Sequence, residues 1–116
     1  MTVYISTPVN GRPEPTFEEK FAAAKERVSY ITELLLSLPY YRNAQFVSTI
    51  DLNPIEEHVT EAVAMGRCIQ ALLESDMVYF DSDWRISRGC TAEFYVAMTY
   101  NIESVKDYNI QKYLGL

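Results

Sequence analysis

The segment Asp76-Met77-Val78-Tyr79-Phe80-Asp81 decides the fold class of this chain of 116 residues. Its four central residues form a nearly continuous apolar run with one aspartate at each end. A strand with one solvated face alternates polar and apolar residues, whereas a strand covered on both faces reads as an apolar run. The pattern therefore predicts a strand in the interior of a parallel sheet.

A long helix is predicted for residues 17–38. Apolar residues recur there at alternating steps of four and three, which places them on one continuous helix face. Thr16 precedes them as an N-cap, and Glu19, three residues later, completes a capping box. Pro39 ends the pattern, because proline cannot continue a helix interior.

The same spacing predicts a second helix from Pro54 to about Ser75. Asn53 is the expected N-cap, and Pro54 suits the first helical position, where its missing N–H has no partner to lose. The single histidine of the chain, His58, falls on the polar face of this helix. We therefore expect His58 to be solvated rather than catalytic.

Further elements complete an alternation of strands and helices. Strands are predicted at 2–6 and 45–50, a third helix at 90–101, and a short fourth strand at 105–110. The third helix is expected to bury Cys90, Phe94, Ala97 and Met98. This order predicts an α/β fold in one domain over residues 1–116: a three-layer, flavodoxin/Rossmann-like parallel sheet of four to five strands with helices on both faces.

Three loops leave the carboxyl ends of the first three predicted strands, at 7–15, 51–53 and 81–89. The first holds three prolines and a glycine in nine residues and is long for a connection. The carboxyl ends of parallel strands share one edge of the sheet, where ligands bind at a switch in strand order. We therefore expect these loops to form a ligand site, unless they are polar only because loops lie at the surface.

The composition limits the classes of partner. Ten basic and sixteen acidic residues give a formal net charge of −6, which would repel a nucleic-acid polymer. The two cysteines show no metal-ligand spacing and the chain has a single histidine, so no zinc site is expected. Neither a Walker A motif nor GxGxxG is present, and no cofactor is expected. No signal peptide or membrane span is readable, so we expect no membrane partner and a cytoplasmic location.

Glu93 is the first candidate for chemistry, because it falls in the first turns of the third predicted helix. The helix N-terminus favours an ionised carboxylate, which can attack an anomeric carbon and form a glycosyl-enzyme intermediate. The alternative is a glutamate that only stabilises its own helix. Asp76 and Asp81 bracket the third strand, where one of them could protonate a leaving base. Otherwise Asp76 only starts the strand and Asp81 caps a loop.

A phosphate could bind just before the third helix. The Ser87 hydroxyl and the Gly89 amide precede a helix start, and Arg88 is a possible charge partner. Ser87 could equally be the N-cap and nothing more. Trp84, in the same polar loop, could stack on a base or cover the site, or only pack on the surface. Cys90 lacks a nearby histidine and is not expected to be catalytic.

Taken together, these residues resemble the nucleoside 2-deoxyribosyltransferase-like superfamily over residues 2–110. Four stretches carry the resemblance. They are Tyr4-Ile5-Ser6-Thr7-Pro8, Asn53-Pro54, Ser75-Asp76-Met77-Val78, and the segment from Asp83 to Glu93 that runs on into Ala97. The family opens with an aromatic-x-(Ala/Ser)-Gly-Pro motif and carries a Ser/Asp-x-Gly-x-x-x-Glu segment, so Thr7 departs from its usual glycine.

The resemblance implies roles for individual residues. Glu93 would be the nucleophile that takes the 2-deoxyribosyl group, Asp76 the acid near sugar and base, and Ser87 a phosphate ligand. The substrate-binding residues expected from pattern and resemblance together are Tyr4, Ser6, Thr7, Pro8, Asn10, Asn53, Asp81, Trp84, Ser87, Arg88 and Gly89. The family is usually oligomeric, so a homo-oligomer is expected, with the tail around 108–113 as a possible interface.

The expected function is cleavage or transfer at the N-glycosidic bond of a (deoxy)nucleoside or its 5′-monophosphate. The acceptor would be another base in a transferase or water in a hydrolase. A binding module for a nucleotide or ADP-ribose-like ligand, without turnover, is the alternative on the same fold. A purely structural oligomer is the third reading, and it leaves the clustered loop residues unexplained.

Overall fold

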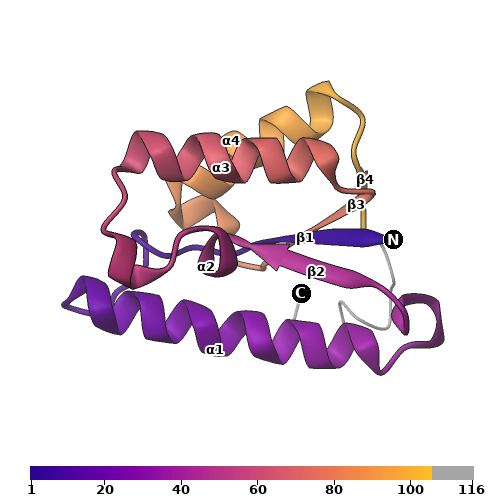
Figure 1. Ribbon diagram of the computed structural model, residues 1–116, viewed down its shortest axis with the longest axis horizontal. Coiled ribbons are helices and arrows are strands. Elements are labelled where there is room, and N and C mark those ends of the chain that lie inside the picture. The colour runs from indigo at the N-terminus through magenta and orange to yellow at the C-terminus, as the bar shows by residue number, and fades with distance from the viewer. Residues whose placement is uncertain (106–116) are drawn as a thin grey trace.

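A four-stranded parallel sheet forms the centre of the computed structural model, which describes residues 1–105 (Figure 1). Its strands are β1 (Thr2–Ser6), β2 (Gln45–Ser48), β3 (Met77–Phe80) and β4 (Glu103–Ser104). They lie in the order β2-β1-β3-β4, and every neighbouring pair is parallel. The predicted α/β class with a parallel sheet is confirmed.

Helices cover both faces of the sheet. The longer ones are α1 (Phe17–Leu36), α3 (Glu61–Glu74) and α4 (Arg88–Thr99), and a single turn, α2 (Thr49–Leu52), follows β2. Short 3-10 turns lie at Pro39–Tyr41, Ile55–Glu57 and Trp84–Ile86. Figure 1 shows α1 on one side of the strands and α3 with α4 on the other, which gives the three layers. No helix within residues 1–105 is long and apolar enough to cross a membrane.

The two faces of β1 build two separate cores. Val3 and Ile5 lie in one buried cluster with Ile31 of α1, whereas Tyr4 lies in another with Leu72 of α3. Successive side chains of a strand point to opposite faces, so a strand between two helix layers needs apolar residues at every position. This arrangement explains the apolar run of β3 from which the fold class was predicted.

The predicted second helix is wrong over its first seven residues. Asn53 ends α2 instead of capping a helix, and α3 begins at Glu61 behind Thr60, whose hydroxyl accepts the Val63 N–H at 3.3 Å. The backbone of Pro54 is extended, and between it and α3 the only helical turn is the 3-10 turn Ile55–Glu57. β2 also ends earlier than predicted, at Ser48, because the Ser48 N–H and hydroxyl donate to the Asp51 carboxylate and start α2.

The remaining boundaries differ less. The Thr16 hydroxyl accepts the Glu19 N–H at 3.1 Å, as an N-cap should, and α1 ends at Leu36. The last strand is β4 at 103–104; of the segment predicted as a strand, 105–110, only Val105 lies among the described residues, and its N–H donates to the Val78 carbonyl at 2.9 Å. The tail at 108–113, expected to be an interface, lies outside them.

The buried side of α4 differs from the expected one. Cys90 and Ala97 are buried as predicted, but the third buried residue is Glu93, and Met98 is 61% exposed. Positions 90, 93 and 97 are spaced by three and four, so they share one helix face. Helix α4 therefore turns a carboxyl group toward the sheet at a position where an apolar residue would be ordinary.

Candidate functional site

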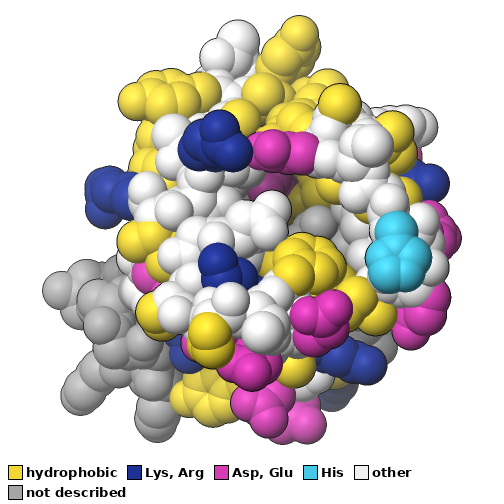
Figure 2. All heavy atoms as spheres, turned by 90° about the vertical axis from the view of Figure 1, so that its left-hand side faces the viewer, with side chains coloured by type: hydrophobic (Ala, Val, Ile, Leu, Met, Phe, Trp, Pro, Cys, Tyr) yellow, Lys and Arg dark blue, Asp and Glu magenta, His cyan; other side chains and the backbone are white. Residues whose placement is uncertain are grey.

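The three loops expected at one edge of the sheet do meet there, around a cavity of about 320 Å³. Its wall is built by the segments that follow β1, β2 and β3 and by the first turns of α4. Figure 2 looks onto this edge and shows the hollow, with hydrophobic side chains in its wall and charges of both signs around the rim. β1 lies between β2 and β3, so the cavity lies where the strand order reverses.

Glu93 lines this cavity from α4 and is 5% exposed. Its Oε2 atom makes no hydrogen bond of ordinary geometry with any described residue. Burial raises the pKa of the carboxyl group from 4.5 to about 7, and the neighbouring hydroxyls of Tyr4 and Ser6 offset only part of that rise. No cation of the described residues lies beside it, and a buried carboxyl group without such a partner is costly to ionise.

Ser87 and Gly89 form the beginning of α4 at the cavity wall. The Ser87 Oγ accepts the Cys90 N–H at 3.2 Å, so Ser87 is the N-cap, and its own hydroxyl proton stays available to a ligand. The Arg88 side chain also lines the cavity, but it is 89% exposed and pairs with Glu61 at 3.3 Å. Hydroxyl, free helix amides and guanidinium together can hold a small anion.

The rest of the wall is largely apolar. Phe17 and Phe21 contribute two rings from the start of α1, with centroids 6.1 Å apart. The other apolar side chains come from three stretches of the chain and are Val9, Pro54, Ile55, Val59, Ala64, Met65 and Ile86. A polar end beside Glu93 and an apolar remainder suit a ligand with a hydroxylated part and a flat, apolar part.

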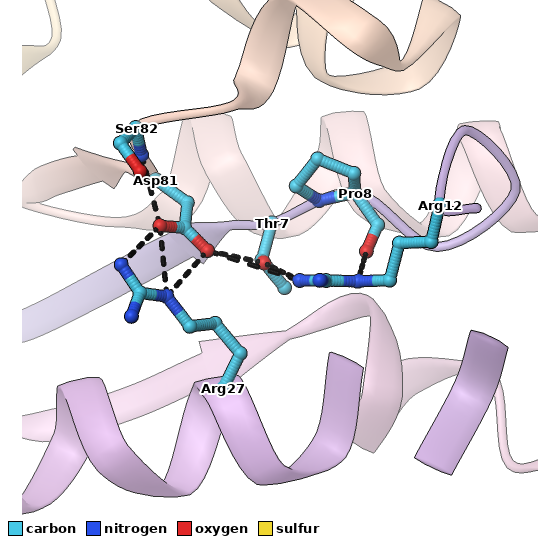
Figure 3. A network of polar contacts seen from close by, with 6 residues as sticks. All are labelled: Thr7, Pro8, Arg12, Arg27, Asp81 and Ser82. Carbon is cyan, nitrogen blue, oxygen red and sulfur yellow. Dashed lines mark hydrogen bonds and ion pairs between the residues drawn. The ribbon is translucent and has the colours of Figure 1, made fainter. Parts of the chain in front are cut away.

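Asp81, at the carboxyl end of β3, is 0% exposed and fully engaged (Figure 3). The Arg27 guanidinium of α1 donates to both of its carboxylate oxygens at 2.8 to 3.0 Å. The Thr7 hydroxyl donates at 2.7 Å and the Ser82 N–H at 2.8 Å. The hydrogen bonds from Arg27 to Asp81 also raise the pKa of Arg27. Asp81 therefore anchors α1 and the loop after β1 rather than facing a ligand.

The loop after β1 is fixed at two further points. Arg12 donates to the Pro8 carbonyl at 2.6 Å and to the Thr7 Oγ1 at 3.0 Å, so the loop folds back on itself (Figure 3). Gly11 packs against the loop after β3, where a Cβ atom would lie 2.2 Å from the Ile86 carbonyl oxygen. Only glycine allows this approach, and the contact joins two walls of the cavity.

Most of the predicted site residues are brought together. Those that line the cavity are Thr7, Asn10, Asn53, Ser87, Arg88, Gly89 and Glu93. Tyr4 and Ser6 lie behind it, beside the Glu93 carboxyl group. Pro8, Asp76, Asp81 and Trp84 do not line it.

Asp76 needs a correction, because it lies at the opposite edge of the sheet. It precedes β3, is exposed, and accepts the Thr2 N–H at 2.8 Å at the start of β1. A residue before a parallel strand lies at the amino edge, so Asp76 cannot assist a reaction at Glu93. Trp84 stacks on Phe94 of α4, with centroids 4.3 Å apart and planes at 13°, which is the packing role left open for it.

Three cavity features were missed. His58 lines the cavity from the irregular segment before α3, with a left-handed φ of 50°. Thr60, a good N-cap residue, was the signal that α3 could start after His58 rather than before it. Cys68 and the ring of Phe17 also line the cavity, and nothing in their local sequence distinguishes them from core residues.

Comparison with known proteins identifies the family. No curated protein and no solved structure matches the sequence. Within residues 1–105, no group of three or more His, Cys, Asp or Glu side chains is placed to hold a metal ion. The model of the family described as "Domain of unknown function (DUF4406)" matches residues 1–106, so the chain belongs to that family.

Proposed function

We propose that the protein cleaves or transfers at the N-glycosidic bond of a (deoxy)nucleoside or its 5′-monophosphate, with Glu93 as the nucleophile. One observation carries the proposal: a buried carboxyl group with an unpartnered oxygen lies in the wall of a cavity at the ligand-binding edge of the sheet. A structural carboxylate at that edge would be paired, as Asp81 is. An unpaired one is retained for what enters the cavity.

The environment of Glu93 suits a nucleophile that first bonds to the anomeric carbon and is later released from it. With its pKa near 7, about half of the molecules carry an ionised Glu93 at neutral pH. The ionised carboxylate attacks the anomeric carbon and the base departs; then a second base or water attacks the same carbon and releases Glu93. The poor solvation that raises the pKa also leaves the carboxylate oxygen free of partners that would have to be removed first.

The surroundings fit the other parts of such a substrate. The beginning of α4, with Ser87 and Gly89, can hold a 5′-phosphate or a sugar hydroxyl. The apolar wall around Phe17 and Phe21, whose rings are tilted by 50° to each other, offers aromatic surface to a base. The resemblance of the sequence to the nucleoside 2-deoxyribosyltransferase-like superfamily supports the same assignment of Glu93 and Ser87.

The test is a panel of deoxynucleosides, ribonucleosides and their monophosphates, each with and without a free base. Base release and base exchange are followed by chromatography. We expect turnover by the wild type and none by Glu93→Gln, which keeps the shape of the side chain. Glu74→Gln, an exposed glutamate at the far end of α3, is the matched control and keeps wild-type activity.

Two outcomes would overturn the proposal. Unchanged turnover in Glu93→Gln would remove Glu93 from the nucleophile role. Tight binding of a nucleotide without turnover by the wild type would favour the binding module on the same fold instead.

The phosphate position has a separate test. Ser87→Ala should weaken binding of a nucleoside monophosphate more than binding of the corresponding nucleoside, because only the monophosphate loses the hydroxyl donor. The ratio of the two affinities cancels any loss of helix stability from the missing cap. An unchanged ratio would place the phosphate elsewhere.

The homo-oligomer expected from the sequence remains a prediction. Exposed apolar side chains on or next to α4 offer a surface for it: Tyr95, Met98 and Tyr100 are each more than 60% exposed. Light scattering measures the mass in solution. Substituting these three residues by serine lowers that mass if α4 is the contact.

A further inference from the structure

The proposed reaction needs a second group that nothing above has supplied. A nucleobase is a poor leaving group as an anion, so a proton must reach it while the bond to the sugar breaks. Asp76, assigned to this role by resemblance, lies at the other edge of the sheet. Among the described residues, those that line the cavity are the candidates for the proton donor.

The ionisable side chains of the described cavity wall can be compared one by one. Besides Glu93 they are His58, Glu61, Cys68, Arg88 and Cys90. Arginine does not release its proton in proteins. Burial raises the pKa of both thiols, that of Cys90 to about 12, so they are weak acids. The Glu61 carboxylate is exposed and pairs with Arg88.

His58 remains, and its position fits the role. It ends the 3-10 turn Ile55–Glu57, and its side chain is exposed. Its φ of 50° lies in the left-handed region, which is uncommon for residues other than glycine, although histidine, asparagine and aspartate adopt it more often than most. Such backbone costs energy and recurs at functional sites. Glu93 and His58 both line the cavity, so a ligand that fills the cavity can contact both side chains.

Four of the charged groups around His58 form two ion pairs with each other. On its own turn, Glu57 pairs with Arg67 at 2.7 Å, and Glu56 is exposed. From α3 and α4, Glu61 pairs with Arg88, and Glu93 is buried. Among residues 1–105 the His58 imidazole has no ion pair and no hydrogen bond, so both ring nitrogens are available to a ligand.

We propose that His58 is the general acid that protonates the departing base; this rests on the proposed function. In the first step the bond from the Glu93 carboxylate to C1′ forms, the bond from C1′ to the base nitrogen breaks, and its electron pair takes the proton of the His58 imidazolium. In hydrolysis, water then attacks C1′, Glu93 departs with its electron pair, and neutral His58 accepts the proton of the water.

Leaving groups of different acidity test this role. The probes are two matched pairs, 2′-deoxyuridine with its 5-fluoro derivative and 2′-deoxyguanosine with its N7-methyl derivative. The second member of each pair has a base that leaves with less need for a proton. The variant is His58→Asn, because asparagine tolerates a left-handed backbone and keeps the turn. Thermal unfolding checks that the variant is folded.

We expect His58→Asn to lose about 100-fold or more in kcat/KM on the unmodified nucleoside. On the activated partner the loss should be at least ten times smaller. Glu93→Gln should lose activity on both. An equal loss in His58→Asn on both members of a pair, or no loss, would overturn the role of His58. Activity of Glu93→Gln would instead overturn the proposed function, so the two failures are distinguishable.

Discussion

Asp81 and Glu93 are two buried carboxyl groups at the same edge of one sheet, and they differ in their partners. Asp81 is 0% exposed and receives hydrogen bonds from Arg27, Thr7 and Ser82. Glu93 is 5% exposed, and within residues 1–105 no cation lies beside it. Burial alone therefore does not separate the two carboxyl groups, whereas the number and charge of their hydrogen-bond partners does.

The difference follows from the layer that each residue faces. α1 carries Arg27, which reaches the end of β3, so a charge there is neutralised. On the side of the sheet toward α3 and α4, the described groups that act on Glu93 are hydroxyls and thiols, from Tyr4, Ser6, Cys68 and Cys90. The first arrangement pairs the buried charge of Asp81 with a cation, and the second leaves the Oε2 atom of Glu93 without a hydrogen bond.

The largest expected effect comes from removing Asp81. Asp81→Ala leaves the Arg27 guanidinium half-buried without its partner, and breaking a buried ion pair costs about 3 to 5 kcal/mol. Urea unfolding measures the change in the free energy of unfolding. Asp76→Asn, an exposed aspartate beside the same strand, is the control and should cost less than about 1 kcal/mol. A loss below about 1 kcal/mol in Asp81→Ala would show that the Asp81 network does not hold the fold.

The second prediction concerns pH and Glu93. Its folded pKa, about 7, lies above its ordinary value of 4.5, so between these values the folded protein binds more protons than the unfolded chain. The contribution to stability is therefore fully present below pH 4.5 and is lost as the pH rises to about 7; the whole change is about 3 kcal/mol.

Glu93→Gln removes this titration. The difference in unfolding free energy between the wild type and Glu93→Gln should move in favour of the variant from pH 5 to pH 8, by up to about 3 kcal/mol. Other carboxyl groups are common to both proteins and cancel in the difference. A flat difference across this range would mean that Glu93 is solvated or paired, which would end the contrast with Asp81.

The position of Glu93 at the edge of the sheet could be predicted from the sequence, whereas the ion pair of Asp81 with Arg27 could not. Strand periodicity and the rule that carboxyl ends share an edge placed the loops together, and the helix start placed Glu93 near them. The pairing of Arg27 with Asp81 joins residues 54 positions apart, and no local pattern encodes it. The error at Asp76 was avoidable, since a residue before a strand belongs to the other edge.

The path of the chain from β2 to α3 was also not predictable, and the reason is different. Asn53-Pro54 is a good helix start by local preference, but the Ser48–Asp51 hydrogen bonds already use that region for α2. Tertiary packing then decides where the next helix begins. This is why His58 was placed on a solvated helix face and was found in the cavity wall.

The third prediction concerns the contact between Gly11 and Ile86, which joins the loop after β1 to the loop after β3. Gly11→Ala forces a Cβ atom against the Ile86 carbonyl, so the loops must move apart, at a cost of about 2 kcal/mol, and the cavity ligand should bind more weakly. Gly66→Ala is the matched control, because nothing lies within 4 Å of its added Cβ and an exposed helix position gains about 0.5 to 1 kcal/mol. Equal stability of the two variants would contradict the close contact.

The smallest expected effect is that of substituting Thr7, which contacts Asp81 and also lines the cavity that contains Glu93. Its hydroxyl donates to Asp81 and accepts from Arg12, while the residue itself lines the cavity. Thr7→Val keeps the shape but leaves the Asp81 carboxylate with one donor fewer, at a cost of about 1.5 kcal/mol. Thr7→Ser keeps the hydroxyl and should recover most of that loss. If valine also lowers kcat/KM while serine restores it, the Asp81 network positions the cavity wall; if stability changes and kcat/KM does not, the two carboxyl groups act independently.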